Sequence, residues 1–399
     1  MAGALDGVVV ADFSRVLAGP YATMLLADLG AEVVKVERPG AGDDTRAWGP
    51  PYAVDGTSTY FAAVNRNKES VAIDVTTDAG LAQARALVRR ADVLVENFKP
   101  GTLERMGLGY REVSRDNPGL VLCSISGFGS GEGSDLPGYD LLVQAMGGLM
   151  SVTGTDPDHP TKVGVALVDV VTGLHAVYGI LAALHHRDRT GAGQHVEVNL
   201  LSSLLSAMVN QSSAYVAGGV VPGILGNDHP SITPYAVYST ADRPLVLAVG
   251  NDRQFRSLVT VLGIPATAAD ERFATNPARV AHRDEVRRAL ETALAAHGAD
   301  HWHRELTAAG VPCGPINDVR SAFDLATSLG LDPVVSVPGS DVPQVANPLR
   351  MSATPPTYRT APPAVGSTPP AAVLAPPTGD AAPADSPVRP APTSSWSRS

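Results

Sequence analysis

The first third of the chain repeats a strand pattern followed by a helix pattern, and this repeat constrains the fold more than any other feature. Apolar runs of strand length occupy residues 7–13, 31–37, 70–75, 92–98 and 120–126. Between two of them, the segment 76–91 places Leu81, Ala84 and Val88 on one face of a helix that Thr77 or Asp78 can cap. Strands that alternate with helices at this spacing are joined by right-handed crossovers. The sequence therefore predicts an α/β fold built on a parallel, doubly wound sheet.

Composition narrows the class of protein and the partners it can have. The chain has 399 residues and a formal net charge of -10, which argues against nucleic acid as the main partner. Its only two cysteines, Cys123 and Cys313, are too few for a disulfide framework, so we expect a cytoplasmic protein. The longest apolar stretch, residues 163–184, is interrupted by Asp169 and by several glycines. We interpret it as buried protein rather than a membrane span.

A doubly wound sheet binds its ligands at the carboxyl ends of its strands, so the loops after the strands are where a site is expected. The loop after the first strand, SRVLAGPYA, lacks the G-x-G-x-x-G pattern of a dinucleotide site. The loop after the second strand offers Arg38. The loop after the fourth offers Phe98 beside Lys99 and Arg105, a combination that suits the base and phosphates of a nucleotide.

Asp169 is the one carboxylate in the long apolar stretch. The pattern predicts a short strand over residues 161–167 and a helix over residues 170–185, which puts Asp169 at the helix N-terminus. There it can cap free backbone N–H groups, or it can act as a nucleophile in a dry pocket. The two roles conflict in part, because a tightly capped carboxylate has a depressed pKa. Local sequence leaves both readings open.

A set of phrases in register from about residue 5 to residue 355 resembles the family III CoA-transferases, which include formyl-CoA transferase, carnitine CoA-transferase and α-methylacyl-CoA racemase. The phrases are SRVLAGPYATMLLADLGAEVVKVERPGAGDDTR, NRNKES, ADVLVENFKPGTLERMGLGY, SGFG, PGYDLLVQAMGGLMSVTG, VGVALVDVVTGLHAVYGILAAL and RTGAGQHVEVNLL. The resemblance implies a Rossmann-like large domain, a smaller α/β domain and an interlocked homodimer. The domains expected are a large domain at residues 1–200, a helix and linker at 201–225, a small domain at 226–325, a return segment at 326–360 and a disordered Pro- and Ala-rich tail at 361–399.

The resemblance also assigns residues to a site. Asp169 falls on the family's catalytic aspartate. The positions that match the CoA site are Leu17, Ala18, Arg38, Ile73, Asp74, Val75, Thr76, Asn97, Phe98, Lys99, Arg105, Pro137, Gly138 and Tyr139. Gly226 and Asn227 are the candidates for a glycine loop over the active site, although the run of consecutive glycines of the formyl-CoA enzymes is missing. Lysines that those enzymes carry at Thr76 and beside Tyr139 are missing as well.

The activity implied is transfer of CoA from an acyl-CoA to a carboxylic acid, through an aspartyl mixed anhydride and an aspartyl-CoA thioester. Backbone N–H groups at the start of the helix after Asp169, or in a Gly-rich loop, would stabilise the oxyanions. One alternative is a racemase, whose His in a G-H-D phrase is replaced here by Tyr139. Another is an acyl-CoA-binding protein without turnover. The substrates expected are acyl-CoA and a small carboxylic acid. No metal is expected, since His229, His282, His301 and His303 lack a metal-ligand spacing.

Overall fold

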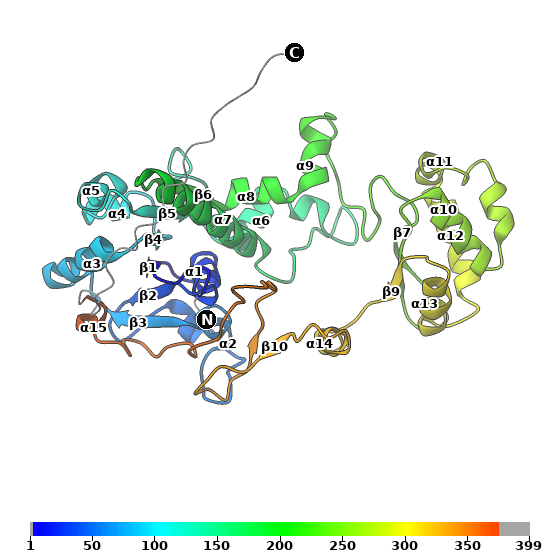
Figure 1. Cartoon of the computed structure of the whole chain (residues 1–399). Coiled ribbons are helices and arrows are strands. Elements are labelled where there is room, and N and C mark those ends of the chain that lie inside the picture. Colours follow the sequence, from blue (N-terminus) through cyan, green and yellow to red (C-terminus); the bar gives the residue numbers. More distant parts are fainter. Residues whose placement is uncertain (1–2, 375–399) are drawn as a thin grey trace, which may run out of the picture.

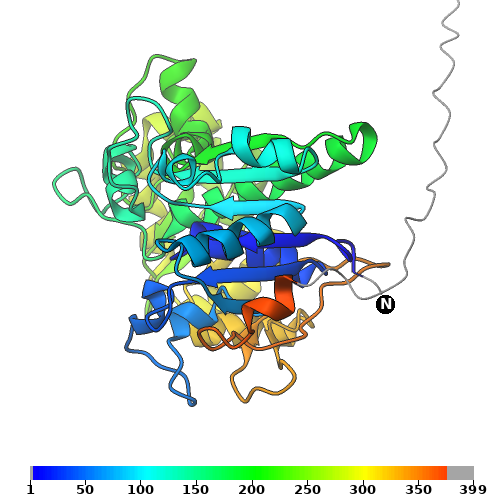
Figure 2. The same cartoon turned by 90° about the vertical axis from the view of Figure 1, so that its left-hand side faces the viewer.

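Six parallel strands form the centre of the molecule. The computed structural model describes residues 3–374 and is shown in Figures 1 and 2. The strands are β1 (Val9–Asp12), β2 (Glu32–Glu37), β3 (Lys68–Ala72), β4 (Val93–Glu96), β5 (Val121–Ser126) and β6 (His195–Asn199), in the order β3-β2-β1-β4-β5-β6. Every neighbouring pair is parallel, which confirms the predicted sheet. No strand was predicted at β6, which extends the sheet beside β5.

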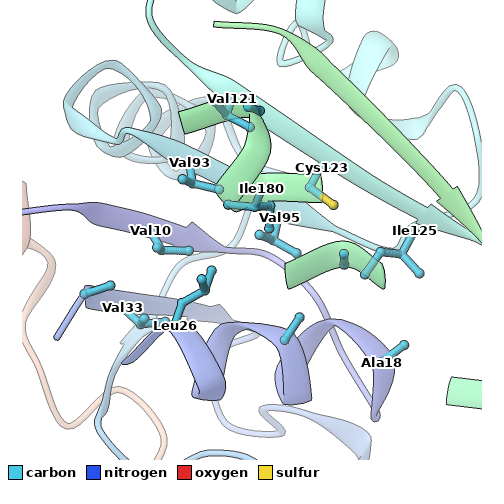
Figure 3. Close-up of a cluster of buried hydrophobic side chains, with 14 of the residues drawn as sticks. Val10, Ala18, Leu26, Val33, Val93, Val95, Val121, Cys123, Ile125 and Ile180 are labelled. Atoms are coloured by element: carbon cyan, nitrogen blue, oxygen red, sulfur yellow. The ribbon is translucent and has the colours of Figure 1, made fainter. Parts of the chain in front are cut away.

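Helices cover both faces of this sheet. One face carries α1 (Ala18–Asp28) and α7 (Leu167–Thr190), and Ile180 of α7 and Leu26 of α1 pack there against Val10 and Val95 (Figure 3). The other face carries α3 (Asp78–Arg90), α4 (Thr102–Arg105) and α5 (Tyr110–Asp116) over a second apolar cluster. Fully burying one aliphatic side chain of this size contributes about 1.5–3 kcal/mol, so these two layers fix the sheet that carries the site.

The segment before α7 differs from the sequence prediction. Residues 161–166 form no strand, and α7 begins at Leu167, so Asp169 lies inside its first turn. The reason is that β6 takes the place beside β5, while the N–H of Val163 bonds to the side chain of Gln144 on α6 (Asp140–Met146). By length and composition α7 could cross a membrane; here it packs on α1 and the sheet.

A second, smaller unit holds its own apolar core. Its antiparallel sheet contains β7 (Tyr235–Tyr238), β8 (Leu245–Ala248) and β9 (Cys313–Pro315), and its helices are α10 (Asp252–Val261), α11 (Asn276–Ala281), α12 (Arg283–Leu294) and α13 (Ala299–Ala308). Leu247, Phe255 and Leu290 lie in its core. Figure 1 shows this unit set apart from the large sheet, reached through the segment after α9 and left through the segment before α14 (Val319–Ser328). The sequence predicts two helices between residues 271 and 311, and the structure has three there.

The remaining elements are short. They are α2 (Thr59–Ala62), α8 (Leu200–Ala207), α9 (Val209–Val216), β10 (Val334–Val335), β11 (Gln344–Val345), and 3₁₀ helices at Asp44–Ala47, Met150–Val152 and Pro265–Ala269. Residues 202–219 were expected to form one long helix. They contain most of α8 and all of α9. The helix is interrupted between the two at Val209, which has a φ of 36°.

The end of the described chain packs against the large sheet. Residues 361–374 were assigned to the disordered tail by the sequence, but the structure places them in defined contacts. Arg46 donates to the carbonyl of Pro363 at 2.9 Å, and the N–H of Gly366 bonds to the hydroxyl of Ser70. Val373 of α15 (Pro370–Leu374) is buried in the cluster beneath α3. The expectation of a disordered tail is therefore wrong for residues 361–374, and its remainder, residues 375–399, lies outside the described residues.

Candidate active site

The site lies where the strand order reverses, at the carboxyl ends of β1 and β4. Two strands that leave this point in opposite directions open a crevice between the loops that follow them. Here Asn97, after β4, accepts from the N–H of Arg15 at 2.8 Å and donates to its carbonyl at 2.7 Å. This reciprocal pair ties the loop after β1 to the loop after β4.

Two adjoining cavities open at this point, of about 390 and 300 Å³, and both are lined by Asp169. The residues that border both are Ala18, Asn97, Phe98, Lys99, Gly138, Tyr139 and Asp169. Leu17 borders the smaller cavity and Pro137 the larger. Nine of the residues assigned by the sequence therefore meet around one space, although they come from four separate stretches of the chain.

The carboxylate that caps α7 is Asp140. Its Oδ1 accepts from the N–H groups of Val168 at 2.8 Å and of Asp169 at 3.2 Å, and its Oδ2 accepts from Gln144 at 2.6 Å. The side chain of Asp169 makes no capping hydrogen bond. The structure thus separates the two roles that the sequence left open: Asp140 satisfies the helix end, and Asp169 faces the cavity.

The surroundings of Asp169 disfavour its charge. Burial, together with the smaller effect of the nearby negative charge of Asp140, raises the pKa of this carboxyl to about 7. Within residues 3–374, Asp169 forms no ion pair with a basic side chain that would offset this effect. Burial also raises the pKa of Tyr60 to about 12, and the charges of Asp169 and Asp140 contribute to that shift. Asp169 is a carboxylate kept poorly solvated without a counter-ion.

Two cationic side chains, Arg15 and Lys99, border these cavities, and Arg38 lies nearby without lining either of them. The guanidinium of Arg15 lies 5.1 Å from the ring centre of Phe98, and burial together with the charge of Arg38 lowers its pKa. Arg38 is exposed and pairs with Asp44, which borders the smaller cavity, at 2.7 Å. Lys99 pairs with Asp135 at 2.7 Å on the exposed side. An anionic ligand with an aromatic group fits this wall.

The other residues assigned by the sequence do not line these cavities. Ile73 is buried under the sheet edge, and Asp74 accepts from the N–H of Thr76 in an exposed turn that also holds Val75. Arg105 donates to the hydroxyl of Thr102. Gly226 and Asn227 border a separate space of about 570 Å³ beside the small unit, with Tyr238 and Arg287.

Sequence reasoning missed several residues of the site. Arg15 and Val16 border the smaller cavity, and Asp43 lies directly behind them. Arg15 and Val16 were within the quoted loop SRVLAGPYA, and their position after the first strand was the available signal. Asp140 and Tyr60 had no such signal, because their importance comes from contact with a residue distant in sequence.

One expectation about the oxyanion donors was wrong. The N–H groups of Val168 and Asp169 donate to Asp140, and the N–H of Val170 donates to the carbonyl of Ala166. These three groups at the start of α7 are already bonded. Of the two sources considered, a Gly-rich loop remains, and Gly127 and Gly138 border the larger cavity.

The sequence and the fold of this chain are similar to those of known proteins. Residues 5–368 match the model of CoA-transferase family III. The chain is 46% identical over 369 residues to a succinate–glutarate CoA-transferase of Agrobacterium fabrum, covering 89% of this chain and 91% of that one. It is 40% identical to an acetyl-CoA:oxalate CoA-transferase of Acetobacter aceti, covering 88% and 90%. The crystal structure of a CAIB/BAIF family protein from Brucella suis superimposes with a TM-score of 0.82 at 42% identity, covering 92% and 97%.

Proposed function

The chain belongs to CoA-transferase family III, and from that premise we propose that Asp169 carries CoA from a donor acyl-CoA to an acceptor carboxylic acid through two covalent intermediates. The observation that carries the proposal is the unpaired carboxylate of Asp169 on the wall shared by both cavities. A carboxylate used as a nucleophile must be free of capping bonds, and a separate residue, Asp140, takes the cap here.

In the first half of the reaction, an oxygen of Asp169 attacks the carbonyl carbon of the donor thioester. The carbon–sulfur bond breaks, CoA leaves as a thiolate, and a mixed anhydride of the aspartate and the donor acid remains. The thiolate then attacks the aspartyl carbonyl carbon of this anhydride. The donor acid leaves as a carboxylate, and Asp169 is held as a CoA thioester.

In the second half, the same steps run in reverse with the acceptor. The acceptor carboxylate attacks the aspartyl thioester carbonyl, which releases the thiolate and forms a new anhydride. The thiolate attacks the acceptor carbonyl carbon of that anhydride, giving the new acyl-CoA and freeing the Asp169 carboxylate. Water would hydrolyse either intermediate, so a site that restricts water protects both.

The CoA moiety is placed by the cationic and aromatic wall. Phe98 offers a face for adenine, and the guanidinium of Arg15 beside it can pair with a phosphate. Arg38, which pairs with Asp44 on the border of the smaller cavity, adds a second cation. The small residues Ala18 and Gly138 border both cavities and leave room for the thin pantetheine arm to reach Asp169. Within this proposal, Ile73–Thr76 and Arg105 would take outer parts of the nucleotide.

The substrate acids proposed are dicarboxylic acids, with succinyl-CoA as the donor. The relatives named above act, by their names, on succinate, glutarate and oxalate, and a further relative of Haloarcula hispanica, 38% identical, is a succinyl-CoA:mesaconate CoA-transferase. All of these are diacids, in which one carboxyl group bears CoA and the other stays ionised.

Mass spectrometry tests the proposal. The purified protein is incubated with succinyl-CoA and then with hydroxylamine, which converts an activated aspartyl group into a hydroxamate. We expect the hydroxamate on Asp169, and we expect Asp169→Ala to lose transfer while it keeps its melting temperature. Asp188→Asn, a change in an exposed aspartate of the same helix, is the matched control and should leave labelling unchanged. Transfer at the wild-type rate by Asp169→Ala would disprove the role. Deuterium exchange at the α-carbon of a 2-methylacyl-CoA, without labelling, would favour a racemase.

We further propose that the protein works as an interlocked homodimer in the cytoplasm. Helices α6 to α9 leave large apolar side chains exposed, among them Met146, Tyr178 and Tyr215. Exposed apolar area of this kind is typical of an interface. The small unit lies apart from the large sheet and is joined to it through two segments (Figure 1), as the interlocking of two chains would require. Both cysteines are free, which suits a reducing compartment.

A further inference from the structure

Val16, on the wall of the smaller cavity, has a backbone conformation that a β-branched residue rarely adopts. Its φ is 68°, in the left-handed region. Strained residues of this kind persist only where the surrounding structure holds them, and they gather at functional sites. Val16 stands between Arg15, which lies over Phe98, and Leu17 and Ala18, which lead into α1 beside Asp169. Rotation about its φ would move these two parts of the wall relative to each other.

A buried ion pair holds Val16 from behind. The N–H of Val16 points at the carboxylate of Asp43, 3.3 and 3.4 Å from its two oxygens. Asp43 accepts from the ammonium of Lys35 at 2.9 Å, and Lys35 also donates to the carbonyl of Ser14 at 3.0 Å. Lys35 and Asp43 are 1% and 2% exposed, so neither touches the cavity or solvent appreciably. The pair thus binds the loop on both sides of Arg15, at Ser14 and at Val16.

The pair keeps its charge in this buried place. Burial alone would raise the pKa of Asp43, but the charge of Lys35 and the hydrogen bonds from Lys35 and Thr45 lower it. Because a buried carboxylate that loses a hydrogen bond is destabilised, the pair resists a relaxation of Val16 that would draw its N–H away from Asp43. Asn97 adds a further restraint on this loop through its two hydrogen bonds to the backbone of Arg15.

We propose that Lys35 and Asp43 are positioning residues for CoA transfer, which hold Val16 in its left-handed conformation and thereby set Arg15 against Phe98 and the start of α1 against Asp169. Neither residue borders the cavities that hold Asp169. The inference rests on the proposed function for its kinetic consequence. Its structural part, the dependence of the Val16 conformation on Asp43, does not need that function.

A double-mutant cycle between Asp43→Asn and Val16→Gly tests this inference. Glycine takes a positive φ without steric cost, so Val16→Gly removes the need for a restraint. For transfer from succinyl-CoA to glutarate, we expect Asp43→Asn to lower kcat/KM by about 100-fold, mainly by raising KM, because a displacement of about 1 Å has that effect. Because Val16 borders the cavity, Val16→Gly has an effect of its own, and each background is compared with itself: we expect Asp43→Asn to cost about 100-fold when residue 16 is valine and only a few-fold when it is glycine.

Asp332→Gly is the matched control, since Asp332 also has a positive φ, of 47°, but is exposed and lies outside the cavities. It should not rescue Asp43→Asn. A merely structural role for Asp43 would lower the melting temperature without a KM effect that Val16→Gly reverses. Wild-type kinetics in Asp43→Asn, or effects of the two changes that combine independently within about twofold, would overturn the inference.

The experiment still tests the inference if some variants do not fold or if the proposed function is wrong. If Asp43→Asn does not fold, Lys35→Gln carries the same expectation. Asp43→Asn and Lys35→Gln could each fold only when combined with Val16→Gly, and such a rescue would be the expected coupling. If both variants also fail to fold in the Val16→Gly background, the inference is refuted. Titration with CoA in a calorimeter and the melting temperatures of the four proteins report the coupling without turnover. A wild-type protein that transfers nothing, but whose variants show this coupling, would disprove the function and keep the inference.

Discussion

At the scale of single residues, the site divides two tasks between two aspartates that sit close together. Asp140 accepts the free N–H groups of α7, and Asp169 is left without a hydrogen bond that would favour its ionised form. Two negative charges in a poorly solvated place repel each other, which is why Asp140 adds to the effect of burial on the pKa of Asp169. The residue that caps the helix therefore also contributes, after burial, to the raised pKa of Asp169.

The pH dependence of transfer follows from this arrangement. In the proposed mechanism Asp169 must be ionised to attack, and with a pKa raised to about 7 it is mostly protonated at lower pH. We expect kcat/KM for the thioester to rise with pH through about 7. Asp140→Asn removes a negative charge and lowers the pKa of Asp169, so the midpoint of the profile moves to lower pH. Measured profiles of the two proteins check this, and an unmoved midpoint would show that Asp140 exerts no charge effect.

Asp140→Ala separates the charge from the cap. It should shift the pH profile in the same direction as Asp140→Asn. In addition it removes the acceptor for the N–H groups of Val168 and Asp169, and loss of such a cap lowers the free energy of unfolding by about 0.5–2 kcal/mol. Thermal denaturation of both variants measures the difference. Equal melting temperatures for the alanine and asparagine variants would contradict the capping role.

At the scale of elements, the packing of α1 against α7 decides where Ala18 and Asp169 stand. Gly173, one turn after Asp169, allows the two helices to approach closely: a Cβ added there would lie 2.8 Å from the carbonyl oxygen of Ala18. Ala18 is buried and starts the helix that borders the cavity (Figure 3). The atom that such a Cβ would meet belongs to the backbone of α1, so a change of side-chain rotamer cannot relieve the contact.

Gly173→Ala should therefore push α1 away from α7. We expect the free energy of unfolding to fall by about 1–3 kcal/mol, as overpacking usually causes, and transfer activity to fall with it because Ala18 moves. Gly179→Ala on the same helix is the matched control. Its nearest contact, at 2.9 Å, is the Cγ1 methyl of Val196, which can turn aside. Chemical denaturation and initial rates distinguish the two variants, and equal behaviour would show that the contact with Ala18 is unimportant.

At the scale of the whole molecule, one chain leaves a large apolar surface uncovered. Leu141 and Met146 of α6, Leu174 and Tyr178 of α7 and Tyr215 of α9 are all exposed, whereas the opposite sides of α6 and α7 are buried in the main core. Gly226 and Asn227, expected over the active site, lie away from the Asp169 cavities within one chain. In the proposed dimer, this loop would serve the site of the other chain.

Sedimentation equilibrium tests the dimer. We expect the wild-type protein to sediment with twice the mass of one chain, and the variant Leu174→Glu/Tyr178→Glu to sediment as a monomer with much reduced transfer activity, because charges are costly in an apolar interface. Val54→Glu changes an exposed valine of the loop before α2 and should stay dimeric. A wild-type protein that is monomeric at all concentrations would contradict the proposal.

The sequence by itself determined the parallel α/β sheet, most of its strands and the expectation of a site in the loops that follow them, with Phe98 and Lys99 as candidates. These features follow from short-range patterns, because hydrophobic period and turn residues act within a few positions, and parallel strands present their carboxyl ends together. The resemblance to a known family then assigned a role to Asp169. The structure brings Asp169 to the crevice between the loops after β1 and β4, beside Asn97 and Phe98.

Only the tertiary structure decided how the site is tuned. The cap by Asp140 comes from a residue 29 positions before Asp169, and the restraint on Val16 comes from Asp43, 27 positions after it. The absence of a strand at residues 161–166 and the packing of Val373 against the sheet are also decided by distant partners. Desolvation and hydrogen bonding depend on which groups are in contact in the folded chain. A local sequence pattern does not specify contacts between residues that are distant in sequence.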